Sequence, residues 1–135
     1  MKKFLIFILF TLFSLNSFAD DEMNLFFNSP SKNIFCGGHN HFVSCMILET
    51  NAKPAQPHPE DCNLDWGQMV YLPIDGKPEL VCHGDFPFEQ NARILNYDER
   101  FGKLKWLCTS SEKGMMCENH LGHGFIISRT LQEFY

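Results

Sequence analysis

Six cysteines constrain this 135-residue chain more than any other feature. They all follow a segment with the pattern of a secretory signal peptide, so their thiols would meet an oxidising compartment. An even number of cysteines in such a compartment favours a disulfide framework, although the sequence alone allows many pairings. The cysteines are Cys36, Cys45, Cys62, Cys82, Cys108 and Cys117.

Spacing favours one of these pairings. The first two cysteines and the last two flank short glycine-containing stretches, so each pair could face across a hairpin. The middle two then pair with each other. Loop-closure entropy gives contributions of about 2.7, 2.7 and 3.3 kcal/mol. Their sum is comparable with the whole stability of a small domain, ~5–15 kcal/mol, so we expect reduction to threaten the fold. The expected pairs are Cys36–Cys45, Cys62–Cys82 and Cys108–Cys117.

Metal ligation is the competing use of these thiols. The chain contains no Cys-x-x-Cys pair, and the intervals between cysteines fit no zinc ribbon. Disulfides are therefore the preferred interpretation.

The first 19 residues predict export. Two lysines follow the initial methionine, and residues 4–13 are almost wholly apolar. This apolar run is too short to span a bilayer of ~30 Å, which takes ~20 residues. Small residues at Ser17 and Ala19 precede an acidic run that begins at Asp20, so we expect cleavage between Ala19 and Asp20. An uncleaved anchor is the alternative. The pattern is typical of a bacterial envelope protein.

The remaining residues, 20–135, predict one domain with an acidic surface. Nine of the eleven basic residues survive cleavage against sixteen acidic ones, which moves the net charge from −5 to −7. This charge argues against a nucleic-acid partner, which would require clustered Lys and Arg. It also argues against binding to anionic lipids and favours a cationic partner.

Short apolar runs separated by turn residues predict a small, mainly β domain. The fold is either a disulfide-stapled sandwich or a partly open barrel of short antiparallel strands. Asp75-Gly76 predicts a hairpin between residues 68–72 and 78–82, and a second hairpin is predicted between 104–108 and 115–117. Further strands are predicted at residues 24–28, 33–36, 41–48 and 124–129, and short helices at residues 88–94 and 131–135.

Two loops could carry recognition. Residues 50–61 contain three prolines, which resist both helix and central strand, so an exposed loop is expected. Exposed loops often bind partners, although a plain spacer is the alternative. Phe86-Pro87-Phe88 could add an aromatic patch, or could pack into the core instead.

Histidines provide a candidate metal site. His39 and His41 would share one face of a β ribbon and could hold zinc or copper between two imidazoles. His120 and His123 would complete the site if the fold brought them near. The alternative places His39 and His41 at a wet hairpin tip and His123 in a tight turn.

Catalytic motifs are weak in this chain. Ser29-Pro30-Ser31-Lys32 matches the Ser-x-x-Lys nucleophile motif of penicillin-binding enzymes, but the companion motifs Ser-Asp-Asn and Lys-Thr-Gly are missing. Ser-Pro-Ser between two apolar runs predicts a turn. With every cysteine paired, a thiolate nucleophile is not expected either. We therefore assign no catalytic residue and no required cofactor.

Residues 27–36 read Phe-Asn-Ser-Pro-Ser-Lys-Asn-Ile-Phe-Cys, which resembles the opening of a family of small secreted bacterial proteins with no defined function. That opening is approximately Phe-x-Ser-Pro-Ser-Gly-Asn-Ile-x-Cys. Lys32 stands where the family usually has glycine, and Asn96-Tyr97-Asp98 stands where a Pro-Tyr-Gly turn is usual. The resemblance implies export and disulfides but no mechanism. Further matches are Cys62 with Asp65-Trp66-Gly67, Cys82-His83-Gly84-Asp85, Cys108-Thr109-Ser110, residues 114–117 with Asn119, Gly122-His123-Gly124-Phe125, and Ser128-Arg129.

These features together predict an exported envelope binding module, located in the periplasm or outside the cell, with a protein partner. An inhibitor or immunity factor against a secreted cell-wall hydrolase is the concrete form of this hypothesis. Its contact surface would include residues 50–61 or 85–89. The alternatives are a periplasmic zinc- or copper-binding protein that uses the paired histidines, and a small hydrolase, which would require a polar cleft.

Overall fold

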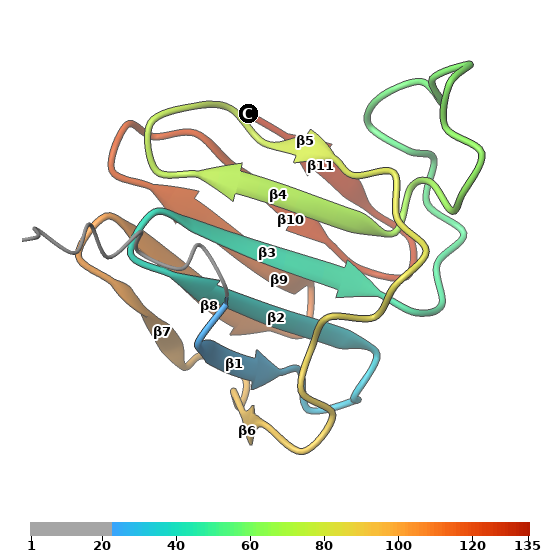
Figure 1. Ribbon diagram of the computed structural model, residues 1–135. Coiled ribbons are helices and arrows are strands. Elements are labelled where there is room, and N and C mark those ends of the chain that lie inside the picture. The colour runs from blue at the N-terminus through green and yellow to red at the C-terminus, as the bar shows by residue number, and fades with distance from the viewer. Residues whose placement is uncertain (1–22) are drawn as a thin grey trace, which may run out of the picture.

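Short segments of alternating apolar residues build two β-sheets that stack face to face (Figure 1). The computed structural model describes residues 23–135, so the predicted signal peptide and its cleavage point between Ala19 and Asp20 lie outside the described residues. The strands are β1 (Leu25–Asn28), β2 (Ile34–His39), β3 (Phe42–Ile47), β4 (Met69–Pro73), β5 (Glu79–Leu80), β6 (Arg93–Ile94), β7 (Arg100–Lys103), β8 (Trp106–Ser111), β9 (Gly114–Asn119), β10 (Gly124–Ile127) and β11 (Gln132–Phe134).

The two sheets form a sandwich. One sheet has the strand order β5-β4-β3-β2-β1-β6, and the other has the order β11-β10-β9-β8-β7. All neighbouring strands pair antiparallel except β1 and β6, which run parallel. The sheets do not close into a barrel, so the sandwich is the correct member of the two predicted forms.

Two similar hairpins occupy the centre of the sandwich. β2–β3 and β8–β9 each consist of six-residue strands joined by a two-residue turn, and each places two cysteines directly opposite one another. The Sγ atoms of Cys45 and Cys117 lie 3.8 Å apart, so the two hairpin disulfides touch between the sheets. All four of these cysteines are completely buried. The disulfides are Cys36–Cys45, Cys62–Cys82 and Cys108–Cys117, the pairs that the spacing favoured.

Trp106 joins the two sheets next to these disulfides. Its ring stacks on Phe27 with a centroid distance of 6.3 Å, and its Nε1 donates to the backbone oxygen of His39 over 2.7 Å. A Cβ atom on Gly38 would lie 3.0 Å from this ring and 2.5 Å from the Phe42 carbonyl oxygen. Glycine in the middle of β2 therefore allows the sheets to approach closely.

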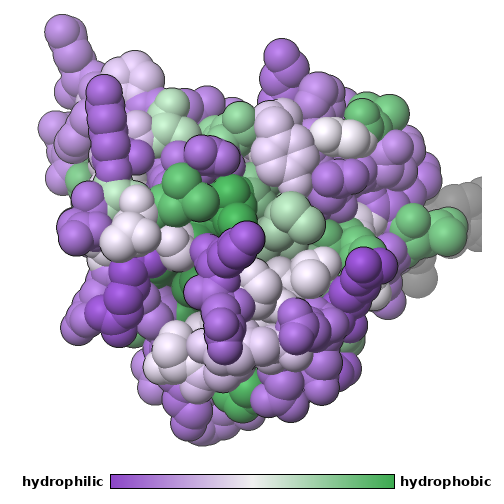
Figure 2. Space-filling view, turned by 180° about the vertical axis from the view of Figure 1, so that it is seen from behind, coloured by the Kyte–Doolittle hydropathy of each residue, from purple (hydrophilic) through white to green (hydrophobic). Residues whose placement is uncertain are grey.

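The outer faces of the two sheets differ. Residues 83–92 cover part of the six-stranded sheet, where the Phe86 ring packs edge-on against Phe35 at 5.0 Å and Phe88 is buried. Phe86-Pro87-Phe88 therefore packs against the sheet. On the five-stranded sheet, Leu107 and Met116 are 42% and 38% exposed. Figure 2 shows hydrophobic side chains gathered across this face.

Two of the predicted elements are wrong. Residues 88–94 form a turn that ends in β6, and residues 131–135 contain β11, so neither predicted helix exists. Both segments are shorter than the ~12–15 residues that an isolated helix needs, and both find backbone partners at sheet edges instead. No helix among residues 23–135 could cross a membrane.

The prediction for the β7–β8 region also needs correction. Residues 100–103 form a strand that the sequence did not indicate, because its charged and glycine residues lack apolar alternation. Leu104, predicted to begin the next strand, lies in the turn and is 96% exposed. The other predicted strands match β1 to β5 and β8 to β10 to within a few residues.

Lys32 and Asp98 have φ angles of 56° and 70°, in the left-handed region that favours glycine. They occupy the two turn positions at which the sequence resemblance implies glycine. Both turns therefore adopt a left-handed conformation without the residue that fits it best.

Lys32→Gly should raise the free energy of unfolding by about 0.5–1 kcal/mol in denaturant titration. Relief of left-handed strain, ~1–2 kcal/mol, exceeds the extra entropy of a glycine in the unfolded chain, ~0.5–1 kcal/mol. Asp98→Gly should gain less, because aspartate tolerates this conformation better. Lys32→Ala is the control and should give no gain; a gain equal to that of glycine would contradict the strain argument.

Mild reduction should open Cys62–Cys82 first and leave the sandwich folded. Cys82 is exposed, whereas the four hairpin cysteines are inaccessible until the sheets separate. Mass spectrometry after thiol alkylation, combined with circular dichroism, measures the order. Alkylation of a hairpin cysteine before Cys62 and Cys82, with β structure intact, would show that burial does not control reduction here.

Candidate functional site

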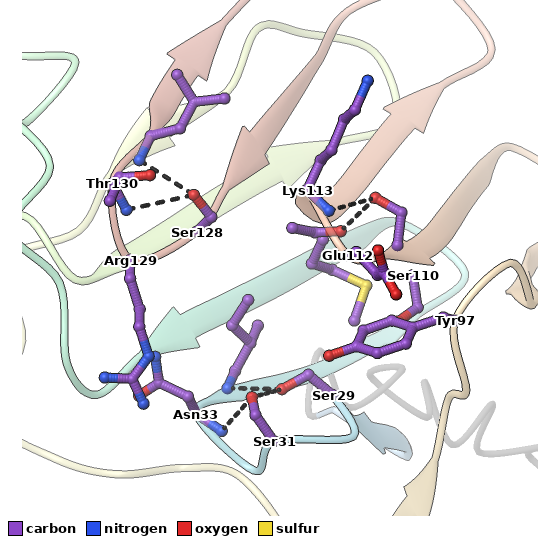
Figure 3. A pocket seen from close by; sticks show the side chains of 15 residues that line it. Ser29, Ser31, Asn33, Tyr97, Ser110, Glu112, Lys113, Ser128, Arg129 and Thr130 are labelled. Carbon is purple, nitrogen blue, oxygen red and sulfur yellow. Dashed lines mark hydrogen bonds between the residues drawn. The ribbon is translucent and has the colours of Figure 1, made fainter.

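A cleft of about 490 Å³ lies at one end of the sandwich. Its walls come from the β1–β2 turn, the β8–β9 turn, the β10–β11 turn and Tyr97 (Figure 3). We call this end of the molecule the cleft end. The residues that line the cleft are Ser29, Ser31, Asn33, Ile34, Tyr97, Ser110, Ser111, Glu112, Lys113, Gly114, Met115, Ser128, Arg129, Thr130 and Leu131.

The β1–β2 turn is organised by its own hydroxyl groups. Ser29 Oγ accepts a hydrogen bond from the Ile34 amide at 3.0 Å, and Ser31 Oγ accepts one from the Asn33 amide at 3.3 Å. The two hydroxyls also share a bond of 3.2 Å. The turn predicted for Ser-Pro-Ser is confirmed. Lys32 lies in this turn, and no helix begins there. A Ser-x-x-Lys nucleophile requires a helix at this point.

Asn33 fixes this turn to the end of β3. Its Nδ2 donates to the Glu49 carbonyl at 3.0 Å, and its Oδ1 accepts from the Glu49 amide at 2.9 Å. The Leu48 amide donates to the Asn33 carbonyl at 2.9 Å. The cleft wall is therefore tied to the point where the proline-containing loop leaves β3.

Ser128 organises the opposite wall. Its Oγ accepts from the amides of Thr130 and Leu131 at 3.3 and 3.1 Å, as Figure 3 shows. Thr50 Oγ1 is within donating distance of two carbonyl oxygens, that of Ser128 at 3.2 Å and that of Arg129 at 3.1 Å. This wall is thus also joined to the beginning of the proline-containing loop.

Charges at the cleft lie on its rim. Arg129 Nη1 donates to Glu49 Oε2 at 2.9 Å, but both side chains are more than half exposed, so this ion pair contributes little to stability. Lys113 and Glu112 are exposed on the β8–β9 turn. The floor is apolar, because Ile34 and Met115 are buried beneath the hydroxyls.

Hydroxyl groups dominate the cleft chemistry. The lining includes no histidine among the described residues, so no imidazole there could take a proton from a serine. The hydroxyls of Ser29, Ser31 and Ser128 already accept backbone amides, which suits turn formation and hydrogen-bond donation. The arrangement is suited to ligand binding through donors.

The proline-containing loop, residues 50–61, projects from the cleft end in Figure 1 but is pinned along its length. The Ala55 amide donates to Gln132 Oε1 at 2.7 Å, and Gln56 Oε1 accepts the Leu80 amide at 2.8 Å. Trp66 Nε1 donates to the Gln56 carbonyl at 3.2 Å, and the His58 ring stacks on Trp66. The prediction of an exposed loop without regular structure is confirmed.

The histidines predicted to bind metal lie at the opposite end of the sandwich. His39 is buried, and its Nδ1 accepts the His41 amide at 2.8 Å. Their rings are 5.4 Å apart and perpendicular. His120 and His123 belong to the β9–β10 turn, where Asn119 Oδ1 accepts the His123 amide.

Among the described residues, these histidines are not part of a group of three potential metal ligands. Within residues 23–135, one group of three potential ligands lies within 4.8 Å, and it consists of disulfide-bonded Cys45, Cys108 and Cys117. The fold therefore brings the two histidine pairs to one end without assembling three ligands.

Tyr135 lies near the histidine pairs. Burial raises the pKa of Tyr135 to about 12, and the Glu118 carboxylate, which accepts the tyrosine hydroxyl at 3.2 Å, contributes to this rise.

A family of unknown function, DUF6636, matches residues 5–135 of the chain. The chain belongs to this family. No curated protein and no solved structure matches it. Membership of DUF6636 therefore assigns no chemistry to the cleft. The three disulfides are consistent with an extracellular or periplasmic location of this DUF6636 protein.

The cleft has no local signature in the sequence. Tyr97, Lys113 and Thr130 carry no local signal for binding, and the serines looked like turn residues, which they also are. A recurrence of hydroxyl residues near 29–31, 110–111 and 128–130 is visible in the chain. Only the stacking of the sheets brings these three segments together.

Asn33→Ala should lower the free energy of unfolding by about 1–3 kcal/mol, because the amide and carbonyl of Glu49 lose their partners beside a buried side chain. Thermal or denaturant unfolding measures the change. Asn91→Ala, at an exposed turn position, is the matched control and should have little effect. Equal stability of the two variants would show that Asn33 does not hold the cleft to β3.

Proposed function

We propose that this protein is an exported binding module that recognises another protein through its cleft end. The observation that carries the proposal is that hydrogen bonds hold residues 50–61 in place beside a cleft lined by hydroxyl donors. Gln132 links the two, because it bonds Ala55 in the loop and Gly67 beyond it while its neighbours form the cleft wall.

Rigidity of the loop favours binding. A free loop would lose conformational freedom on association, at roughly 0.5–1.5 kcal/mol for each ordered side chain. Here Pro54, Pro57 and Pro59 restrict the backbone, and the Cys62–Cys82 disulfide holds the far end of the segment. Most of that ordering is complete before a partner arrives.

The partner we favour is a basic secreted hydrolase of the cell envelope, with the protein acting as its inhibitor or immunity factor. Support comes from the acidic net charge of −7 predicted for residues 20–135 and from exposed Glu60 and Asp61 on the loop. Complementary charges would raise the association rate and disfavour acidic partners. The disulfide framework supports a rigid module for the periplasm or the cell exterior.

Charge reversal on the loop tests this proposal. Oxidised protein of residues 20–135 is immobilised and exposed to envelope and secreted fractions, and the retained hydrolase is assayed with and without the protein. Glu60→Lys should weaken retention and inhibition about tenfold or more. Asp75→Lys, on the β4–β5 turn at the opposite end, is the matched control, because it changes the net charge equally.

If Glu60→Lys and Asp75→Lys lose retention and inhibition equally, net charge alone explains the loss, and recognition by the loop is contradicted. If folded protein retains nothing beyond a reduced, unfolded sample, the proposal of a protein partner fails.

A further inference from the structure

We propose that the cleft binds a carboxylate that is carried next to an apolar group. This inference rests on the proposed function, because it names the chemistry that the cleft end would recognise. It concerns the cleft residues alone and makes no use of the loop charges.

The hydroxyl protons of Ser128 and Ser110 lack acceptors among residues 23–135. Ser128 Oγ accepts two backbone amides, so both of its lone pairs are used and its O–H is free to donate to a ligand in the cleft. Ser110 is 1% exposed and lines the cleft, and its hydroxyl has no hydrogen-bond partner among the described residues. Buried polar groups are normally paired, so the Ser110 hydroxyl calls for an acceptor in the cleft, and partly buried Ser128 offers a second donor there.

The β1–β2 turn supplies another donor. Ser29 and Ser31 each accept a backbone amide and share a single hydrogen bond, so one of their two hydroxyl protons remains. Figure 3 shows these hydroxyls on the wall opposite Ser128, with the ring of Tyr97 reaching toward them. A ligand between the walls would therefore meet donors from both sides.

Charge on the rim limits the ligand to a single negative charge. Lys113 makes no ion pair among the described residues, and Arg129 uses only Nη1 in its bond to Glu49. Glu112 and Glu49 oppose these two cations, so the rim is close to neutral overall. A carboxylate can accept about four hydrogen bonds, which suits the available donors. A phosphate dianion would meet stronger repulsion from the two glutamates.

Apolar side chains define the other half of the ligand. Ile34 and Met115 are 6% and 1% exposed and form the floor, and half-buried Leu131 closes one side. The volume of about 490 Å³ exceeds what a carboxylate alone would fill and lies in the range of small-ligand sites, ~300–1,000 Å³. A peptide C-terminus with an apolar last residue and a small branched carboxylic acid are two sources of this chemistry.

Titration of ¹⁵N-labelled, oxidised protein (residues 20–135) distinguishes these sources. The probes are acetyl-Gly-Leu-Leu as free acid, the same peptide as C-terminal amide, and 4-methylpentanoate. The free acid should shift the amide resonances of residues 29–34, 110–115 and 128–131, and the amide should not. Shifts with 4-methylpentanoate as strong as those with the peptide would identify a small acid as the source. Weaker shifts would identify a peptide terminus.

Variants connect the binding to the named donors. Ser110→Ala should weaken the acid about fivefold or more, and Lys113→Met about tenfold, since a bond to a charged acceptor is lost in each case. Lys105→Met, at the opposite end, is the matched control for Lys113→Met and should bind normally. Ser110→Ala removes a single hydroxyl without a protein partner, so the fold should persist, and the spectrum itself reports any unfolding.

Three results would overturn the inference: equal shifts with acid and amide, shifts centred on the basic β7–β8 hairpin, or no shifts at ~10 mM ligand, where a millimolar site would be occupied. Glu60→Lys should leave peptide binding unchanged. If Glu60→Lys loses partner retention and the wild type binds no peptide, the carboxylate site is rejected and the proposed function stands. If the wild type binds the peptide and Glu60→Lys retains the partner normally, recognition by the loop is rejected and the carboxylate site stands.

Discussion

Two disulfides face one another between the sheets, and the register of both sheets depends on them. Cys45 and Cys117 touch across the core, while each disulfide joins strands that already pair directly. A slip of one residue would turn every inward side chain outward, and the covalent bonds forbid it. In both hairpins, three residues, a two-residue turn and three residues separate the cysteines, so turn and disulfide specify the same register.

This central constraint places the turns at each end of the sandwich, and the two ends differ in character. One end brings hydroxyl-bearing turns around a cleft and anchors residues 50–61 through Gln132 and Asn33. The other holds the two histidine pairs and the exposed Leu104 on the β7–β8 turn. A rigid scaffold with functional groups on its loops is the usual way in which a β-sandwich binds a partner.

Much of the fold could be predicted, because its signals are local. Apolar runs bounded by turn residues located β1 to β5 and β8 to β10, and equal cysteine spacing indicated both hairpins. β7 and β11 were missed because their residues are mostly polar or charged, and an edge strand needs only one neighbour to satisfy its backbone. β6 pairs with β1 across more than 60 residues of chain, a separation for which no local pattern gives evidence.

The sequence by itself indicated the disulfide framework and determined the tight turns and the exposed proline-containing loop, since each depends on neighbouring residues or on cysteine spacing. The tertiary structure decided which of these features meet. It brought Ser29, Ser110 and Ser128 to one cleft and, in the described part of the chain, placed the histidine pairs outside any compact group of three ligands. The physical reason is that sheet stacking, driven by burial of the core around Trp106 and the paired disulfides, joins segments about 80 to 100 residues apart that no local interaction links.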